Sequence, residues 1–140
     1  MRILYATAAL LAALSLSALA EGDADKGAKT FKKCKACHAI VADDGTTIVR
    51  GGRVGPNLYG VVGRRAASVE EFKYGKGLVE AGEIGLVWDK ENFIEYLKNP
   101  PRFVAAYIGV PKVVARMAFR LSKGGEDLYA YLKRVAEDGS

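Results

Sequence analysis

Two cysteines and the chain's single histidine stand within five residues, in the segment Cys34-Lys35-Ala36-Cys37-His38. Two cysteines separated by two residues can present both sulfurs to the two vinyl groups on one edge of a porphyrin, and the adjacent histidine can then reach the iron from one face. This spacing is the attachment signature of a c-type haem, so it predicts one covalent haem c held through Cys34 and Cys37, with His38 as an iron ligand. The rest of the chain is expected to wrap around that group.

Three other uses of this segment compete with haem attachment. A thioredoxin-like redox pair is expected in a βαβ context, which the sequence does not show, and a zinc site needs further Cys or His ligands. A structural disulfide between Cys34 and Cys37 stays open as an alternative in an exported protein. Haem attachment is favoured because Cys34, Cys37 and His38 are the only cysteines and the only histidine of the chain.

The first 20 residues have the composition of an export signal rather than of a folded domain. Arg2 gives a short positive start, residues 3–19 form an apolar run, and residues 18–20 offer a small-residue cleavage site. We therefore expect a secretory signal peptide over residues 1–20 and a periplasmic product. An uncleaved membrane anchor is the alternative, because the run approaches a membrane-spanning length. The short distance to the Cys34 segment argues against it, since a tether needs a long polar linker.

Residues 21–140 are expected to form one domain, because this length suffices for one modest core but not for two. Without Arg2 this segment carries 20 Lys and Arg against 16 Asp and Glu, a net charge of about +4 before the haem carboxylates are counted. A basic exported monomer is expected to dock transiently on acidic surfaces. Nucleic-acid binding is not expected, since basic and acidic residues are interspersed and no binding motif is present.

Helical periodicity and capping residues predict an all-α fold of about four to five helices joined by long loops. Expected helical segments are about 24–33, a short helix near Phe72 begun by the capping box at 68–71, a helix after Asp89 that ends before Pro100, a turn around 103–107, and about 126–137. The glycines at 75, 77, 82 and 85 predict an irregular segment up to Trp88. Residues 39–53 are expected to form a loop that can hold a small hairpin.

Met117 is the candidate for the second iron ligand. A six-coordinate haem iron needs a ligand opposite His38, and residues 21–140 contain no other histidine and no other methionine. An ordinary core methionine, a lysine ligand or an open iron position are the alternatives. Ligation by His and Met raises the reduction potential and closes both faces of the iron, which predicts electron transfer rather than catalysis.

Several segments together resemble a known family: the 34–38 segment, Gly55-Pro56-Asn57-Leu58-Tyr59-Gly60, residues 95–100, Met117 and residues 124–128. On these segments the chain from residue 21 onward resembles class I cytochrome c, and most of all its bacterial cytochrome c2 branch. The resemblance implies the class I cytochrome c fold around one haem. It also implies an electron carrier from the cytochrome bc1 complex to a photosynthetic reaction centre or cytochrome c oxidase.

The resemblance further implies roles for residues around the haem. Pro56 would offer its carbonyl to His38, and Tyr96 would place a hydroxyl near the Met117 sulfur. Three residues would hold the buried haem propionates: Arg64, Tyr74 and Trp88. For the three aromatic residues, a purely structural role in the core is the alternative, although buried Trp and Tyr usually need a polar partner.

The loop before Met117 departs from the family pattern, because residues 108–115 are mostly aliphatic where relatives usually carry lysines. A basic rim remains available from Lys33, Lys35, Arg102, Arg116 and Lys123. Docking is therefore expected to rely more on apolar contact than is usual, unless the valines only pack the loop. The rival functions are a haem enzyme or gas sensor with an open or labile sixth iron position, and a dedicated donor to one periplasmic oxidoreductase.

Overall fold

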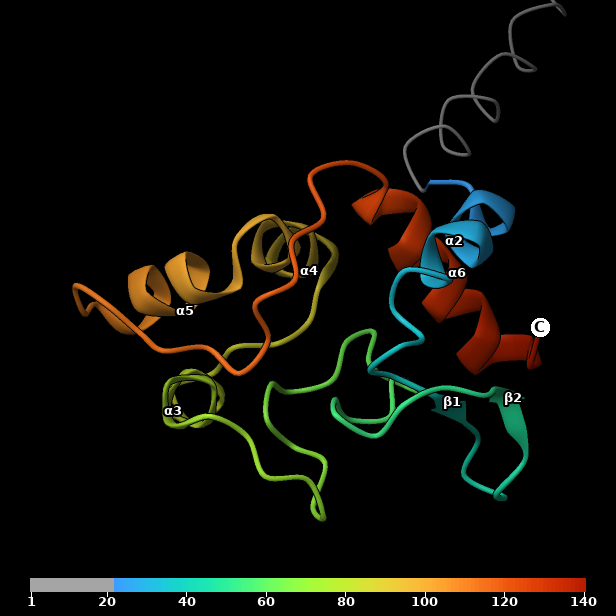
Figure 1. Ribbon diagram of the computed structural model, residues 1–140, viewed down its shortest axis with the longest axis horizontal. Helices are drawn as coiled ribbons and strands as arrows, with labels where there is room; N and C mark the ends of the chain where they lie inside the picture. Colours follow the sequence, from blue (N-terminus) through green and yellow to red (C-terminus); the bar gives the residue numbers. More distant parts are fainter. Residues whose placement is uncertain (1–21) are drawn as a thin grey trace, which may run out of the picture.

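The computed structural model describes residues 22–140, so the predicted signal peptide over residues 1–20 lies outside the described residues. Five helices make up most of the regular structure there: α2 (Ala24–Phe31), α3 (Lys76–Glu83), α4 (Lys90–Lys98), α5 (Pro100–Ile108) and α6 (Gly125–Asp138). The short strands β1 (Ile40–Val41) and β2 (Thr47–Val49) pair antiparallel as a small hairpin. The all-α class with about four to five helices and long loops is confirmed (Figure 1).

The first and last described helices, α2 and α6, lie side by side (Figure 1). Asp23 begins α2, because its side chain accepts hydrogen bonds from two backbone N–H groups of the first turn. The rings of Phe31 and Tyr131 pack with centroids 5.9 Å apart. A Cβ atom at Gly27 would lie 2.6 Å from the Tyr131 Cβ, so glycine permits this close approach. Gly27 and the Phe31–Tyr131 ring pair therefore hold α2 close against α6.

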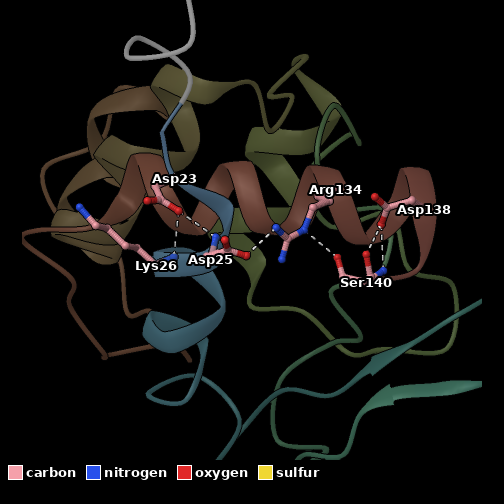
Figure 2. Close-up of polar contacts among 6 residues, drawn as sticks. All are labelled: Asp23, Asp25, Lys26, Arg134, Asp138 and Ser140. Atoms are coloured by element: carbon pink, nitrogen blue, oxygen red, sulfur yellow. Dashed lines mark hydrogen bonds and ion pairs between the residues drawn. The ribbon is translucent and has the colours of Figure 1, made fainter.

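Exposed polar contacts accompany this helix pair (Figure 2). Arg134 of α6 donates from Nη1 to Asp25 Oδ1 at 2.9 Å and from Nε to the Ser140 carbonyl at 2.8 Å. The Asp23 backbone N–H donates to Asp127 Oδ1 at 2.8 Å. Because exposed ion pairs contribute little, the buried contact at Gly27 matters more for how α2 and α6 are held together.

The helices α4 and α5 follow each other with a single residue between them. Asp89 caps α4 by accepting from Asn92 N at 2.8 Å, and α4 ends before Pro100 as predicted. Asn99 then caps a new helix whose first two residues are Pro100 and Pro101. The expected single turn around 103–107 is thus a full helix, α5, because proline is well suited to the first turn of a helix.

Two predictions between residues 68 and 88 are wrong. No helix begins at the 68–71 capping box, because the Ser68 hydroxyl donates to the Arg65 carbonyl at 2.7 Å and does not cap backbone N–H groups. The glycine-rich segment that follows is not irregular, since it forms α3. There Gly77 and Gly82 face close neighbours, Val113 and the Ala66 carbonyl, so packing rather than chain breaking explains these glycines.

The core brings together side chains of α2, β1, α6 and the segment between α3 and α4. Its most deeply buried side chains are Phe31, Ile40, Leu86, Leu128, Leu132 and Val135. Within residues 22–140 no helix has the length and apolar character needed to cross a membrane.

Candidate functional site

A cavity of about 340 Å³ lies beside this core, between the 34–38 segment, the loop around residues 54–64 and the loop that carries Met117. Its walls are mostly apolar, with few polar groups, as is typical of cofactor sites. All nine site residues predicted from the sequence line it: Cys34, Cys37, His38, Pro56, Arg64, Tyr74, Trp88, Tyr96 and Met117.

The 34–38 segment turns tightly as soon as α2 ends. The Cys34 carbonyl accepts from Cys37 N at 3.1 Å and from His38 N at 3.0 Å, which brings all three side chains to one wall of the cavity. No disulfide joins the two cysteines, of which Cys34 is half-buried and Cys37 exposed. Burial raises the pKa of the Cys34 thiol to about 11, against a smaller lowering effect of the Lys33 charge.

His38 is oriented by one strong hydrogen bond. Its Nδ1 donates to the Pro56 carbonyl at 2.7 Å, the contact that the resemblance implies, and this leaves Nε2 as the nitrogen that can bind a metal. A Cβ at Gly55 would lie 2.6 Å from Nδ1, so glycine lets the backbone run directly against the ring. Burial lowers the pKa of His38 and the Pro56 hydrogen bond opposes this effect. The neutral imidazole needed for metal binding is therefore favoured.

Met117 lies half-buried on the loop between α5 and α6. Tyr96 of α4 donates its hydroxyl to the Met117 sulfur at a distance of 3.7 Å, which matches the arrangement that the resemblance implies. The Tyr96 ring also packs on Trp88, with centroids 4.8 Å apart. Burial raises the pKa of Tyr96 from 10.0 to about 12, so the hydroxyl stays protonated well above neutral pH and can donate a hydrogen bond to the sulfur.

Arg64 places a positive charge in the cavity wall without an acidic partner. Its Nη1 donates to the Tyr59 carbonyl at 3.0 Å and its Nη2 to the Asn57 carbonyl at 3.3 Å. The ion pairs described among residues 22–140 involve Lys98 and Arg134, and none of them places a carboxylate on Arg64. Burial lowers the pKa of its guanidinium. A half-buried cation of this kind favours an anionic group in the cavity.

Tyr74 and Trp88 line the same cavity as Arg64. The Trp88 backbone N–H donates to the Arg64 carbonyl at 2.9 Å, so the two residues are fixed as neighbours. The Tyr74 hydroxyl accepts from Val69 N at 3.2 Å, which leaves its own O–H available to donate elsewhere.

These features fit a haem. The thiols of Cys34 and Cys37 lie near one edge of an apolar cavity, whose wall also carries a metal-binding nitrogen, a thioether sulfur and a cation that lacks an anion. The described residues contain no cluster of three or more His, Cys, Asp or Glu side chains suited to a metal ion, so the zinc alternative has no ligand set there.

The basic residues predicted for the rim are all exposed, but not all of them line the cavity. Lys33 and Arg116 line the cavity, whereas Arg102 lines a separate groove beside α5. Two apolar residues at the cavity are strongly exposed, Val54 at 77% and Val114 at 86%.

Sequence reasoning missed the part played by Asn57. Its Oδ1 accepts from Val41 N at 2.9 Å and its Nδ2 donates to the Val41 carbonyl at 2.8 Å, so the side chain pairs with β1 as a strand would. The same Oδ1 accepts from Tyr59 N at 3.1 Å. Asparagine after proline is a turn signal, but only the fold reveals that it ties the hairpin to the loop beneath His38.

Comparison with known proteins identifies the family. The chain matches no protein-family model. It is 51% identical over 137 residues to cytochrome c-551 of Roseobacter denitrificans, covering 96% of this chain and 98% of that protein. It is 51% identical over 132 residues to cytochrome c2 of Rhodobacter capsulatus, covering 94% and 96%.

A solved cytochrome structure has the same fold as this chain. The X-ray structure of ferric cytochrome c-550 from Paracoccus versutus superposes with a TM-score of 0.80 at 48% identity, covering 83% of this chain and 99% of that one. Cytochromes of this kind carry haem c and transfer electrons. The chain belongs to the class I cytochrome c family, in the bacterial branch that includes the cytochromes c2, c-550 and c-551.

Proposed function

We propose that this electron-carrying cytochrome works in the periplasm as a soluble monomer. It would take one electron at a time from the cytochrome bc1 complex and deliver it to a photosynthetic reaction centre or to cytochrome c oxidase. The observation that carries the proposal is the pair of candidate iron ligands, His38 and Met117, in one cavity. If His38 and Met117 both hold the iron, small substrates would have little access to the metal, which favours electron transfer over catalysis.

Each site residue has a role that its contacts support. Cys34 and Cys37 would attach the haem, each thiol adding across one vinyl group to form an S–C bond. His38 would bind through Nε2 while Pro56 holds Nδ1. Tyr96 would orient the Met117 sulfur. A bound haem supplies the redox centre, an iron that cycles between the ferrous and ferric states.

The remaining polar residues would stabilise the haem carboxylates. Arg64 would offer its remaining N–H donors, and Tyr74 and Trp88 their hydroxyl and indole N–H groups. Arg64 is already held by two backbone carbonyls, so its position does not depend on the ligand. A pre-ordered site of this kind changes little when the iron changes charge, as a fast electron carrier requires.

The axial role of Met117 is tested by spectroscopy of the ferric haem-loaded protein. Ligation by a thioether gives a near-infrared sulfur-to-iron charge-transfer band, which we expect at neutral pH in the wild-type protein and not in Met117→Ala. If the wild-type protein lacks the band, the iron has an open or different sixth ligand, and the haem enzyme or gas sensor becomes the better proposal.

The partners are tested by electron-transfer kinetics at two salt concentrations. We expect reduction by the cytochrome bc1 complex and oxidation by a reaction centre or oxidase to slow as salt is added, because exposed cations such as Lys33 and Lys35 steer the encounter. Turnover that is independent of ionic strength would exclude docking through the basic rim. Reaction with a single periplasmic oxidoreductase alone would instead favour a dedicated donor.

Export is tested by mass spectrometry of the haem-loaded protein from a periplasmic extract. Cleavage of the predicted signal peptide would leave a chain that begins at Glu21. A product that keeps residues 1–20 in the membrane fraction would contradict this part of the proposal.

A further inference from the structure

The loop that carries Met117 is tied to a distant segment of the chain by its neighbour Arg116. Arg116 donates from Nη1 to the Lys73 carbonyl at 2.7 Å, across 43 positions in the sequence. Gly75 lies beside the same side chain, since a Cβ there would be 3.7 Å from Arg116 Cγ. The residue before Met117 is thus bound to the segment that leads into α3.

A second contact joins the same two parts of the molecule. A Cβ at Gly77 of α3 would lie 2.8 Å from Val113 Cγ1 and 3.1 Å from Val104 Cγ1, so Val113 occupies a notch that exists only because residue 77 is glycine. Val104 belongs to α5 and is 2% exposed, which makes it a fixed wall. Figure 1 shows this loop, in orange, passing α3 after it leaves α5.

The rest of the loop offers few alternatives for holding it. Val110 is 37% exposed and Val114 is 86% exposed, so neither packs as Val113 does. After Met117, the Leu121 backbone N–H donates to the Leu97 carbonyl at 2.8 Å and fixes the far side of the loop. The stretch between α5 and α6 contains no helix or strand. Such irregular segments open locally unless tertiary contacts stabilise them.

We propose that the Val113–Gly77 contact and the Arg116–Lys73 hydrogen bond form one fastening that sets how often Met117 leaves the iron. Gly77, Val113 and Arg116 are then positioning residues for the sixth ligand. The inference rests on the proposed function, in which Met117 binds the iron. It gives the aliphatic loop a role inside this molecule, separate from any docking surface.

The opening of the loop can be measured with imidazole as an added ligand. Imidazole can bind the ferric iron only when Met117 is off, so its apparent dissociation constant is the intrinsic value divided by the open fraction. A change in the fastening therefore appears directly as a fold-change in imidazole affinity, read from the loss of the sulfur-to-iron band of the haem-loaded protein.

The notch is tested with Gly77→Ala. The added methyl must push Val113 away, and we expect imidazole to bind about threefold to tenfold more tightly. Val113→Ala should have an effect in the same direction. In the double variant the methyl no longer meets Val113 and keeps only its contact of 3.1 Å with Val104, so the imidazole affinity should lie closer to wild type than the product of the two single effects. Glu80→Ala, an exposed change in the same helix, should leave the affinity unchanged.

The hydrogen bond is tested with Arg116→Gln, whose shorter side chain cannot reach the Lys73 carbonyl. We expect imidazole to bind about threefold to tenfold more tightly. Arg120→Gln removes the same charge three residues after Met117 and is the matched control. If both variants show the same shift, net charge and not the fastening controls the loop, and the proposal is wrong.

Hydrogen exchange gives an independent measurement. Peptides covering residues 110–120 should exchange faster in Gly77→Ala and Arg116→Gln than in their controls. A wild-type protein without the sulfur-to-iron band would overturn the axial role of Met117 itself. A normal band, with wild-type imidazole affinity and exchange in both variants, would overturn only the fastening. If Gly77→Ala fails to bind haem, the imidazole affinities of Arg116→Gln and Val113→Ala still test the fastening.

Discussion

At the scale of single residues, polar side chains that line the cavity are fixed by hydrogen bonds to the protein and keep a further polar group available for a ligand. His38 gives Nδ1 to Pro56 and keeps Nε2, while the Tyr74 hydroxyl accepts from Val69 and keeps its proton to donate. Arg64 is held by two carbonyls and retains further N–H groups. Side chains supported in this way need little reordering when a ligand binds, which lowers the entropic cost of binding.

Gly55→Ala should disturb His38 directly. The new Cβ would lie 2.6 Å from His38 Nδ1, so either the ring tilts or the loop moves, and the hydrogen bond to Pro56 weakens. We expect the free energy of unfolding of the ferric haem-loaded protein to fall by about 2 kcal/mol in guanidinium titrations. Gly75→Ala is the control, because its Cβ would be 3.7 Å from the nearest side-chain atom. Equal losses in both variants would show that the effect is not specific to the ring.

Tyr96→Phe should change how stability depends on pH. Burial raises the pKa of Tyr96 from 10.0 to about 12, so the folded state holds this proton more tightly than the unfolded state. The associated stability is fully present below pH 10 and is lost as the pH rises through about 12.

The two proteins are compared by urea unfolding at neutral pH and at about pH 11. Relative to Tyr96→Phe, the wild-type protein should lose unfolding free energy as the pH rises, by at most about 3 kcal/mol once the phenol is fully ionised. Parallel pH profiles would mean that the Tyr96 hydroxyl is not the group responsible.

The sequence contains enough to name the residues of this cavity, but not all the contacts that hold them. The short-range pattern at 34–38 and the absence of a rival for Met117 suffice for the candidate ligands, and both line one cavity. The contact between Arg116 and Lys73 joins residues 43 positions apart, and nothing in either residue type signals it.

At the scale of helices and strands, local signals succeed where a helix carries its own side-chain cap or a clear buried stripe. This holds for α2 after Asp23, for α4 after Asp89 and for α6 with its buried stripe. It fails for α3, because glycines that usually break helices are needed there by close neighbours. Tertiary packing between distant parts of the chain determines that α3 forms, and helix propensity does not describe such packing.

Gly27→Ala tests the packing of α2 on α6. In an isolated helix this change stabilises by about 1 kcal/mol. Here the methyl would overlap the Asp127 carbonyl and lie 2.6 Å from the Tyr131 Cβ, so we expect a net loss of about 3 kcal/mol in unfolding free energy. Lys29→Ala, on the exposed side of the same helix, should change stability little. A stabilised Gly27→Ala variant would mean that the two helices can separate without cost.

At the scale of the whole molecule, the face around the cavity combines exposed apolar and basic groups. Val54 and Val114 are 77% and 86% exposed, and Lys33 and Arg116 line the same opening. Such a surface suits brief encounters, in which charge speeds the approach and a small apolar contact sets the dwell time.

Val114→Glu should therefore weaken the encounter with an acidic partner. We expect the second-order rate constant for electron transfer to the acceptor to fall about tenfold at low salt. Ile84→Glu is the control, since Ile84 is 59% exposed just after α3 and does not line the cavity. The two variants carry the same net charge, so equal slowing would point to overall charge rather than to this face.

The cavity also implies an order of events in the making of the protein. The walls of the cavity are mostly apolar, so without a haem these side chains would lack close packing partners. Without the haem, the polypeptide would gain little free energy by folding around this cavity. Cys34, Cys37 and His38 are contiguous and can meet a porphyrin on a chain that is still extended, whereas Met117 arrives from far down the sequence. Attachment would come first, and the chain would close over the haem afterwards.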